Sequence, residues 1–210
     1  MFGLSVLGSV AWICHDVWSA FRYIEPKPIR RRVHKVLEDV ARTIFPRDKS
    51  LQITIFLPDS ADGTPVLVPI VRYHRACPDE YRVSSKVRFR PDSTKLVRQA
   101  WDDPGENYGQ NIPATTFKSL ESARSWYVHH MEMPTATALK LSEWTLSKVQ
   151  CVMVVALHVP FLPKQPIGIA SFSSEQVDAF KFEDDQDKRR KLALGAMLQV
   201  VSVMLAPLRS

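Results

Sequence analysis

Cysteine is scarce in this chain of 210 residues, which contains only Cys14, Cys77 and Cys151. The three lie far apart, and no cysteine or histidine grouping has the spacing of zinc ligands. A disulfide-stapled secreted scaffold is therefore not expected, and a reducing, cytoplasmic location fits best. The sequence also lacks internal repeats and low-complexity tracts. Its hydrophobic content of 45% and charged content of 24% are those of a globular domain.

A strong charge of one sign is also missing, because 28 Lys and Arg residues stand against 22 Asp and Glu residues, a formal net charge of +6. The densest basic run is Arg30, Arg31, Arg32 and Lys35, at the start of a helical pattern. No aromatic residues interleave with it, so it is interpreted as a solvated helix face. Nucleic-acid binding is not expected.

Residues 1–23 are the most apolar stretch of the N-terminal segment 1–25, but the uninterrupted part ends at Cys14. Fourteen residues make about 21 Å of helix, less than the hydrocarbon core of about 30 Å. No Lys or Arg precedes the run, so a secretory signal lacks its basic start. Apolar residues instead recur in a heptad-like seam, which predicts a helix that packs on its own domain or on a second copy. The seam consists of Val6, Val10, Ile13, Val17, Ala20 and Ile24.

A membrane anchor remains an alternative for this segment. Residues 1–23 would then hold the protein at the inner membrane, with the basic flank at Lys27 and Arg30 on the cytoplasmic side. Separation of membrane and soluble fractions distinguishes the two hypotheses.

The first half of the remaining chain predicts a helix and a hairpin. Apolar residues at helical spacing predict a helix over residues 29–45. Residues 51–57 alternate as a strand does, and a Pro/Asp/Gly-rich turn links them to a second strand over residues 66–73. Pro69 within that strand predicts an edge position or a bulge.

The middle of the chain gives weaker signals. A short strand is expected over residues 82–89, a helix over 94–101 with Ser93 as its N-cap, and a loop over the turn-rich residues 102–111. A further helix is expected over 120–131, capped by Ser119. The pattern of residues 141–148 is left open.

Clear signals return near the C-terminus. Residues 151–159 are almost continuously apolar and predict a buried strand, with residues 167–173 as its hairpin partner and close packing at Gly168. Residues 184–205 predict a long helix with acidic residues at its start, where the helix dipole favours them. One sheet backed by the two flanking helices would bury all these apolar surfaces.

Order and pattern together resemble the GAF domain family. VLEDVA (36–41) resembles the family's first helix, LQITIFLPD its first strand, and VMVVALHVPFLPKQPIGIASFSS its closing hairpin. Phe180, Phe182 and Leu192-Ala193 resemble the return into its last helix. The resemblance covers about residues 29–208. It implies an α+β, PAS-related fold: an antiparallel sheet of about six strands, the terminal helices on one face, and a small-molecule pocket on the other.

A sensory or regulatory function follows from that resemblance, with a small-molecule ligand, a homodimer joined by its helices, and a separate output protein. The sequence identifies neither ligand nor cofactor. The dimer contacts expected are the seam residues and the last helix: Val6, Val10, Ile13, Val17, Leu198 and Val201.

Five residues are candidates for the ligand site: Arg72, Tyr108, Trp126, His130 and Trp144. Arg72 ends a strand and could meet an anion, or could be a solvated strand end. Tyr108 lies in the expected loop. Trp126 and His130 are four residues apart on one helix and could offer an aromatic plane and an imidazole, or a core filler and an exposed histidine.

A metal site is not expected, because the neighbouring histidines of that helix point about 100° apart and no third ligand has suitable spacing. Two further functions remain open. The first is a degenerate GAF domain whose pocket is filled by Trp126 and Trp144. The second is a GAF-fold reductase, which would need Cys77 as a thiolate and Cys151 as its resolving partner.

Overall fold

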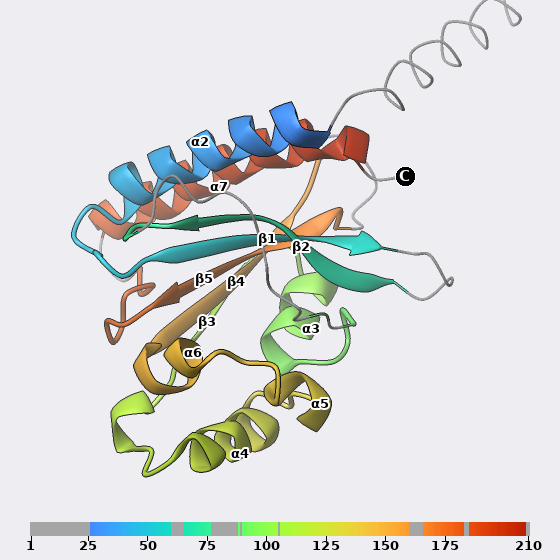
Figure 1. Cartoon of the computed structure of the whole chain (residues 1–210). Helices are drawn as coiled ribbons and strands as arrows, with labels where there is room; N and C mark the ends of the chain where they lie inside the picture. The colour runs from blue at the N-terminus through green and yellow to red at the C-terminus, as the bar shows by residue number, and fades with distance from the viewer. Residues whose placement is uncertain are drawn as a thin grey trace, which may run out of the picture.

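The computed structural model describes residues 26–59, 65–76, 88, 90–104, 106–159, 166–182 and 185–208. These residues form three layers (Figure 1). Two long helices, α2 (Pro26–Ile44) and α7 (Asp185–Leu205), lie side by side on one face of a sheet. Four shorter helices, α3 to α6, lie on the opposite face. Residues 1–25, with the predicted apolar helix and its seam, lie outside the described part.

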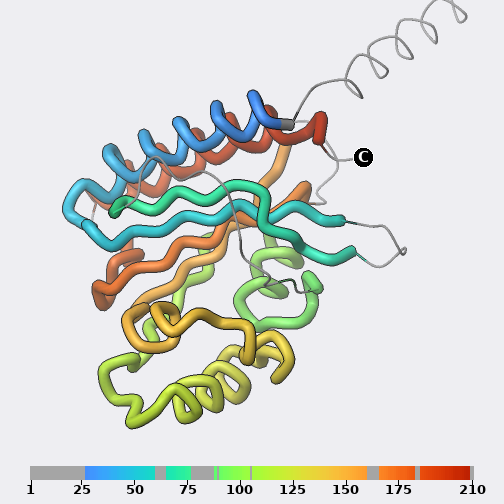
Figure 2. Tube along the Cα trace, in the orientation of Figure 1, coloured from blue at the N-terminus to red at the C-terminus, as the bar shows by residue number. Residues whose placement is uncertain are grey.

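The sheet has five strands in the order β2-β1-β5-β4-β3, and every neighbouring pair is antiparallel. Pairing of β1 with β5 joins the first hairpin to the last one, as the tube in Figure 2 shows. The predicted common sheet with flanking helices on one face is thereby confirmed. The strand expected over residues 82–89 lies outside the described residues except for Arg88, which is not in a strand. The strands are β1 (Gln52–Asp59), β2 (Val66–His74), β3 (Asn107–Asn111), β4 (Cys151–Leu157) and β5 (Gly168–Ser174).

Pro69 lies on an edge strand and beside an irregularity. Strand β2 is at the end of the sheet order, and its register with β1 shifts between Ile55, which faces Val71, and Phe56, which faces Pro69. Proline has no amide hydrogen to donate to a neighbouring strand. At an edge or beside an irregularity the sheet therefore does not lose a hydrogen bond. Both expectations for Pro69 are confirmed.

Strand β3 corrects the prediction of a loop over residues 102–111. Its sequence, NYGQN, has no apolar alternation, so the pattern gave no strand signal. Backbone pairing with β4 makes it a strand nonetheless, from Asn107 opposite Val155 to Asn111 opposite Cys151. Strand formation depends on the neighbouring strand as much as on the residues themselves.

The first residues and N-caps of the helices agree with the predictions for α4, and differ from them for α2 and α3. Helix α2 begins at Pro26 instead of residue 29, because proline is tolerated in a first helical turn. Helix α3 (Lys95–Asp102) begins after Thr94, and the hydroxyl of Ser93 donates to the carbonyl of Arg90, so Ser93 is not the N-cap. Helix α4 (Leu120–His130) has the expected cap, since Ser119 accepts from the backbone amide of Ser122. The segment that was left open contains α6 (Glu143–Lys148), which follows the single turn of α5 (Thr135–Ala138).

The main core lies between the sheet and the long helices. Alternate strand residues such as Ile53, Ile55 and Phe172 are fully buried there against α2 and α7. Leu198 and Val201 belong to this core, with exposed fractions of 3% and 0%. Their prediction as dimer contacts was wrong, because the helix period turns them toward their own sheet.

The outer side of α7 is apolar too. Its exposed large hydrophobic residues are Leu192, Val200 and Val203. Among the helices the structure describes, only the stretch from α7 to Leu208 is long and apolar enough to cross a membrane by length and composition. Leu194 and Leu205 of this helix pack into the main core.

Candidate ligand-binding cavity

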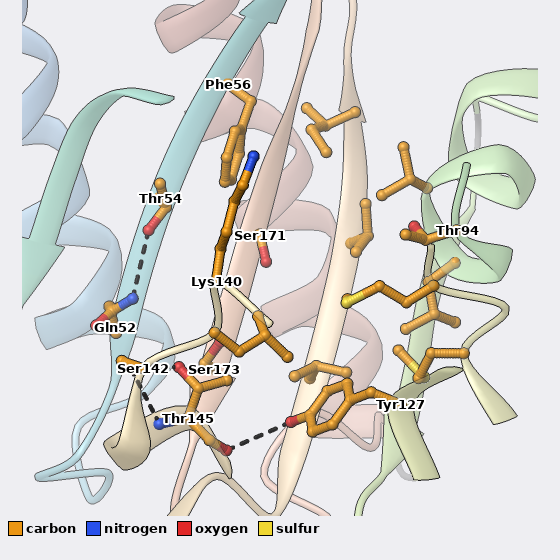
Figure 3. A pocket seen from close by; sticks show the side chains of 18 of the residues that line it. Gln52, Thr54, Phe56, Thr94, Tyr127, Lys140, Ser142, Thr145, Ser171 and Ser173 are labelled. Carbon is orange, nitrogen blue, oxygen red and sulfur yellow. Dashed lines mark hydrogen bonds between the residues drawn. The ribbon is translucent and has the colours of Figure 1, made fainter. Parts of the chain in front are cut away.

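A cavity of about 520 Å³ lies between the sheet and the layer of short helices. Residues of β1, β2, β4 and β5 form its floor, and residues of α3, α4 and the α5–α6 region form its walls and roof (Figure 3). This volume lies within the usual range for small-molecule sites, about 300–1,000 Å³.

Strand alternation decides which side chains reach the cavity. Successive residues of a strand point to opposite faces, so Gln52, Thr54 and Phe56 line the cavity while Ile53 and Ile55 pack on the helices. Strand β5 divides in the same way. Its residues Ile169, Ser171 and Ser173 line the cavity, and Phe172 enters the core.

The strand register gathers the polar side chains. Arg72 is opposite Thr54, Thr54 is opposite Ser171, and Gln52 is opposite Ser173. Cross-strand partners on one face are about 5 Å apart, so these side chains are direct neighbours. Thr54 is 4% exposed, and its hydroxyl accepts from the side-chain amide of Gln52 at 3.5 Å.

The rest of the cavity is lined mainly by apolar side chains. Val152 and Val154 of β4 continue the polar rows across the sheet, opposite Ser173 and Ser171. Around them lie further apolar groups of the floor and of the α3 side: Phe56, Ile169, Leu96, Val97, Met131 and Met133. In the rows of Gln52 and Thr54, the floor thus changes from polar on β1 and β5 to apolar on β4, and Phe56 and Ile169 form a further, apolar row.

The roof contributes hydroxyl groups and one cation. Tyr127 of α4 is buried and donates from its hydroxyl to the carbonyl of Thr145 at 3.4 Å. Burial raises the pKa of Tyr127, so this phenol is neutral at physiological pH. Ser142 caps α6 by accepting from the amide of Thr145 at 3.2 Å. Lys140, in the turn before α6, extends over β1 and β5 toward Phe56 (Figure 3).

The charge in this cavity has one sign. Arg72 and Lys140 are its cations, and no Asp or Glu occurs among the lining residues that the structure describes. Low-dielectric walls lined by one sign of charge concentrate ions of the opposite sign. The cavity can therefore accommodate an anionic group.

Of the five residues predicted for the site, Arg72 lines the cavity and the other four do not. The Trp144 indole donates to the Glu175 carboxylate at 2.7 Å and meets His74 edge to face. Trp126 and His130 stack with ring centroids 4.9 Å apart, and His130 is exposed.

Tyr108 lies on β3, not in the expected loop, and its hydroxyl donates to Asp103 at 2.8 Å. Arg75, three residues after Arg72, serves a different purpose. Its guanidinium donates to the carbonyls of Phe45 at 2.6 Å and Asp48 at 3.0 Å, next to the end of α2. Only one arginine of this strand end therefore reaches the cavity.

Sequence reasoning missed most of the polar lining, including Thr54, Ser171 and Lys140. The available signal was the alternation itself, since QITIF and IASFS place polar residues between apolar ones. A polar strand face is ordinarily assigned to solvent. Here the short-helix layer covers it.

The cysteine chemistry of the reductase hypothesis gains no support. Cys151 is buried on the face of the sheet that α2 and α7 cover, and burial raises the pKa of its thiol. A neutral buried thiol is a poor nucleophile. Cys77 lies outside the described residues. Within the described ranges, no three His, Cys, Asp or Glu residues are grouped to hold a metal ion.

Comparisons with known proteins find similar solved structures but no similar sequence. No protein-family model and no curated protein sequence matches the chain. Solved structures similar to it include the GAF domain region of a putative membrane protein from Geobacter sulfurreducens, at 11% identity and a TM-score of 0.49, covering 86% of this chain and 97% of that one. The GAF domain of an Acinetobacter phosphoenolpyruvate-protein phosphotransferase has 10% identity, a TM-score of 0.47 and coverages of 86% and 92%. The PixJ GAF domain of Thermosynechococcus elongatus has 11% identity, a TM-score of 0.42 and coverages of 83% and 85%. The structural neighbours of this α+β chain are GAF domains.

Proposed function

We propose that this chain is a sensory or regulatory module of the GAF type that binds a small organic molecule in the cavity above the sheet. The observation that carries the proposal is the cavity itself. A space of about 520 Å³ over a floor with neighbouring polar side chains is suited to a ligand that fills it and pairs with them.

The alternative of a filled, purely structural pocket is less well supported. That hypothesis expected Trp126 and Trp144 to plug the open face of the sheet. Neither side chain lines the cavity. Trp126 stacks on His130, and Trp144 is held by Glu175.

A non-catalytic role fits the same geometry. The hydroxyl, guanidinium and ammonium groups of the lining suit binding, and the described thiol, Cys151, lies on the opposite face. Ligand binding in the cavity would act on a separate output protein through α2 and α7. These helices pack on the same strands that line the cavity.

A thermal-shift screen with a blocked variant tests ligand binding. Ser171→Trp places a large ring in the cavity, and Ser125→Trp places the same ring on the exposed part of α4 as a matched control. A compound at 100 times its Kd stabilises the fold by about 2.7 kcal/mol, which raises Tm by roughly 5–10 °C. We expect that shift in the unchanged protein and in Ser125→Trp, but not in Ser171→Trp. Silence across a broad metabolite library, or a shift that survives in Ser171→Trp, would contradict the proposal.

Two copies of the module pair through the outer side of α7 in this proposal. Leu192, Val200 and Val203 lie three to four residues or their multiples apart and form one exposed apolar stripe. Helix α2, which follows the predicted seam of residues 1–25 in the sequence, lies beside α7. A symmetric dimer would bury both stripes at once and would extend the contact into Val10 and Val17.

Light scattering tests the pairing. We expect a dimer for the unchanged chain and a monomer for Val203→Asp and for Val10→Asp, because an unpaired carboxylate in an apolar contact is costly. Val177→Asp changes an exposed valine outside α7 and should leave the dimer intact. If Val203→Asp and Val10→Asp both kept the mass of the unchanged protein, neither α7 nor the seam would form the dimer interface.

A further inference from the structure

The first half of α2 carries a basic face, which consists of the exposed side chains of Lys27, Arg30, Arg32 and Lys35. We propose that this basic face binds the surface of a membrane that contains anionic phospholipids. The inference goes beyond the proposed function, because the basic face is on the opposite side of the sheet from the cavity.

The basic face has no acidic residue near it on its own helix. From residue 26 to residue 37 the sequence contains neither Asp nor Glu. The first carboxylate of α2 belongs to Glu38, which pairs with Arg42. Among the residues that the structure describes, no carboxylate forms an ion pair with any of the four cations. Their positive charge is therefore available to an anionic partner.

The neighbouring helix adds no carboxylate either. Helix α7 runs antiparallel to α2, since Arg190 near its start donates to the carbonyl of Ile44 at the end of α2. The beginning of α2 therefore lies beside the end of α7 (Figures 1 and 2). Residues 192–208, which include this end of α7, contain no charged side chain. The helix layer thus leaves the charge of the basic face unbalanced at this end.

The surroundings of the basic face favour lipid over nucleic acid. Helix α2 is amphipathic, with Val33 and Leu37 in the core and the cations toward solvent. Four to eight Lys and Arg residues clustered on an amphipathic helix are typical of binding to anionic lipids. A surface for single-stranded nucleic acid would have aromatic residues among the cations, and α2 contains no Phe, Trp or Tyr. The segment that precedes α2 in the sequence, residues 1–23, is mostly apolar.

The spacing of the cations sets the expected strength. Lys27 and Lys35 are about 12 Å apart along the helix axis, so the four charges can meet one patch of head groups together. Each Lys or Arg near an anionic membrane strengthens binding by about fivefold. Four cations acting together should favour an anionic over a neutral membrane by a factor of about 100 or more.

Vesicle sedimentation with the full chain tests the proposal. One set of vesicles contains equal parts of phosphatidylcholine and phosphatidylglycerol, and the other contains phosphatidylcholine alone. Residues 1–25 meet both kinds of vesicle, so the ratio of the two partition coefficients measures the contribution of charge. We expect a ratio of about 100 or more at low salt, and a loss of most of it at about 1 M salt, where the Debye length is about 3 Å.

Charge-matched variants locate the contact. Arg32→Gln combined with Lys35→Gln should lower the ratio by about 25-fold, and Lys27→Gln combined with Arg30→Gln by a similar factor. Glutamine has nearly the helix propensity of Lys and Arg, so α2 should keep its structure, which circular dichroism checks. The control combines Lys118→Gln with Lys148→Gln, two exposed cations in the layer of short helices. It removes the same net charge and should leave the ratio within about twofold.

Four outcomes would overturn the inference. The first is equal binding of the unchanged protein to the two kinds of vesicle, and the second is a ratio that both pairs of changes in α2 leave intact. The third is an equal loss in the control, which would mean that net charge alone attracts the protein. The fourth is displacement from anionic vesicles by duplex DNA at the same phosphate concentration, which would assign the basic face to nucleic acid.

Discussion

The two faces of the sheet are built from alternate residues of the same strands, yet one is filled and the other is hollow. Under α2 and α7, Phe172 and its neighbours are fully buried against two helices of 19 and 21 residues. On the other face, Ser171 looks into a cavity covered by helices of 4 to 11 residues. Long continuous helices can fill a sheet face evenly. Short helices joined by turns leave space between them.

Arginine has different surroundings on the two sides. On the helix side, Arg190 donates from Nε to the carbonyl of Ile44 at 3.0 Å, and Arg75 binds the carbonyls of Phe45 and Asp48. These bonds satisfy the end of α2, where carbonyl groups lack helical partners. Arg72 instead lines the cavity. Arg75 and Arg190 thus stabilise the helix layer, whereas Arg72 is part of the cavity wall.

The largest expected effect separates neighbouring residues of β5. Phe172→Ala removes a fully buried ring that meets Phe45 and Phe180, and should lower the free energy of unfolding by about 3–5 kcal/mol. Ser171→Ala removes a hydroxyl that faces the cavity and should change it by less than about 1 kcal/mol. Urea unfolding measures both. Similar losses in the two variants would mean that the faces are packed alike.

The strands that form both faces could be predicted where their own sequences alternate. LQITIFL and IGIASFS carry the period of two in their side chains, which predicts the strands of the two hairpins. The joint between the hairpins, β1 with β5, is seen only in the folded chain. Strand β3 could not be predicted, because NYGQN has neither apolar alternation nor β-branched residues. Its backbone pairing with β4 is a property of the folded chain.

The cavity was harder to predict than the sheet. Arg72 could be proposed from its place at a strand end, but Thr54 and Ser171 have the pattern of a solvated face. Their participation depends on the layer from α3 to α6, whose distance from the sheet no local pattern encodes. Trp126 was proposed on helical spacing with His130. That spacing was confirmed by their stacking, but both rings lie outside the cavity lining.

A smaller effect tests how closely the strands approach each other. A methyl group added at Gly168 would lie 2.4 Å from the carbonyl oxygen of Phe56 and 2.7 Å from a Leu57 methyl. Because the backbone of β1 cannot easily move, Gly168→Ala should lower the free energy of unfolding by about 1–3 kcal/mol. Gly195→Ala is the matched control on the exposed side of α7, where nothing lies within 4 Å. Because alanine has a higher helix propensity than glycine, Gly195→Ala should raise the free energy of unfolding by about 0.5–1 kcal/mol. Urea unfolding measures both variants. If both changed the free energy of unfolding in the same direction, Gly168 would not be packed more closely than Gly195.

Two buried tyrosines sharpen the comparison at alkaline pH. Tyr127 is in the roof of the cavity, and Tyr73 packs under α2. Burial raises the pKa of Tyr127 and of Tyr73 above 10.0, but at Tyr73 the charge of Arg75 opposes the shift. A raised folded pKa means that stability is complete below pH 10 and falls as pH rises, because the unfolded chain ionises first.

Stability should therefore fall more steeply with pH in the unchanged protein than in Tyr127→Phe. With the folded phenol still protonated at pH 11, the ionising unfolded state costs the unchanged protein about 1.4 kcal/mol relative to this variant. Tyr73→Phe should relieve a smaller part of the loss, since Arg75 stabilises the phenolate in the folded state. Urea unfolding at pH 9 and pH 11 measures both differences. If Tyr73→Phe reduced the loss of stability more than Tyr127→Phe, Tyr73 under the long helices would be the less hydrated of the two tyrosines. The hydroxyl of Tyr127 would then be in contact with water from the cavity.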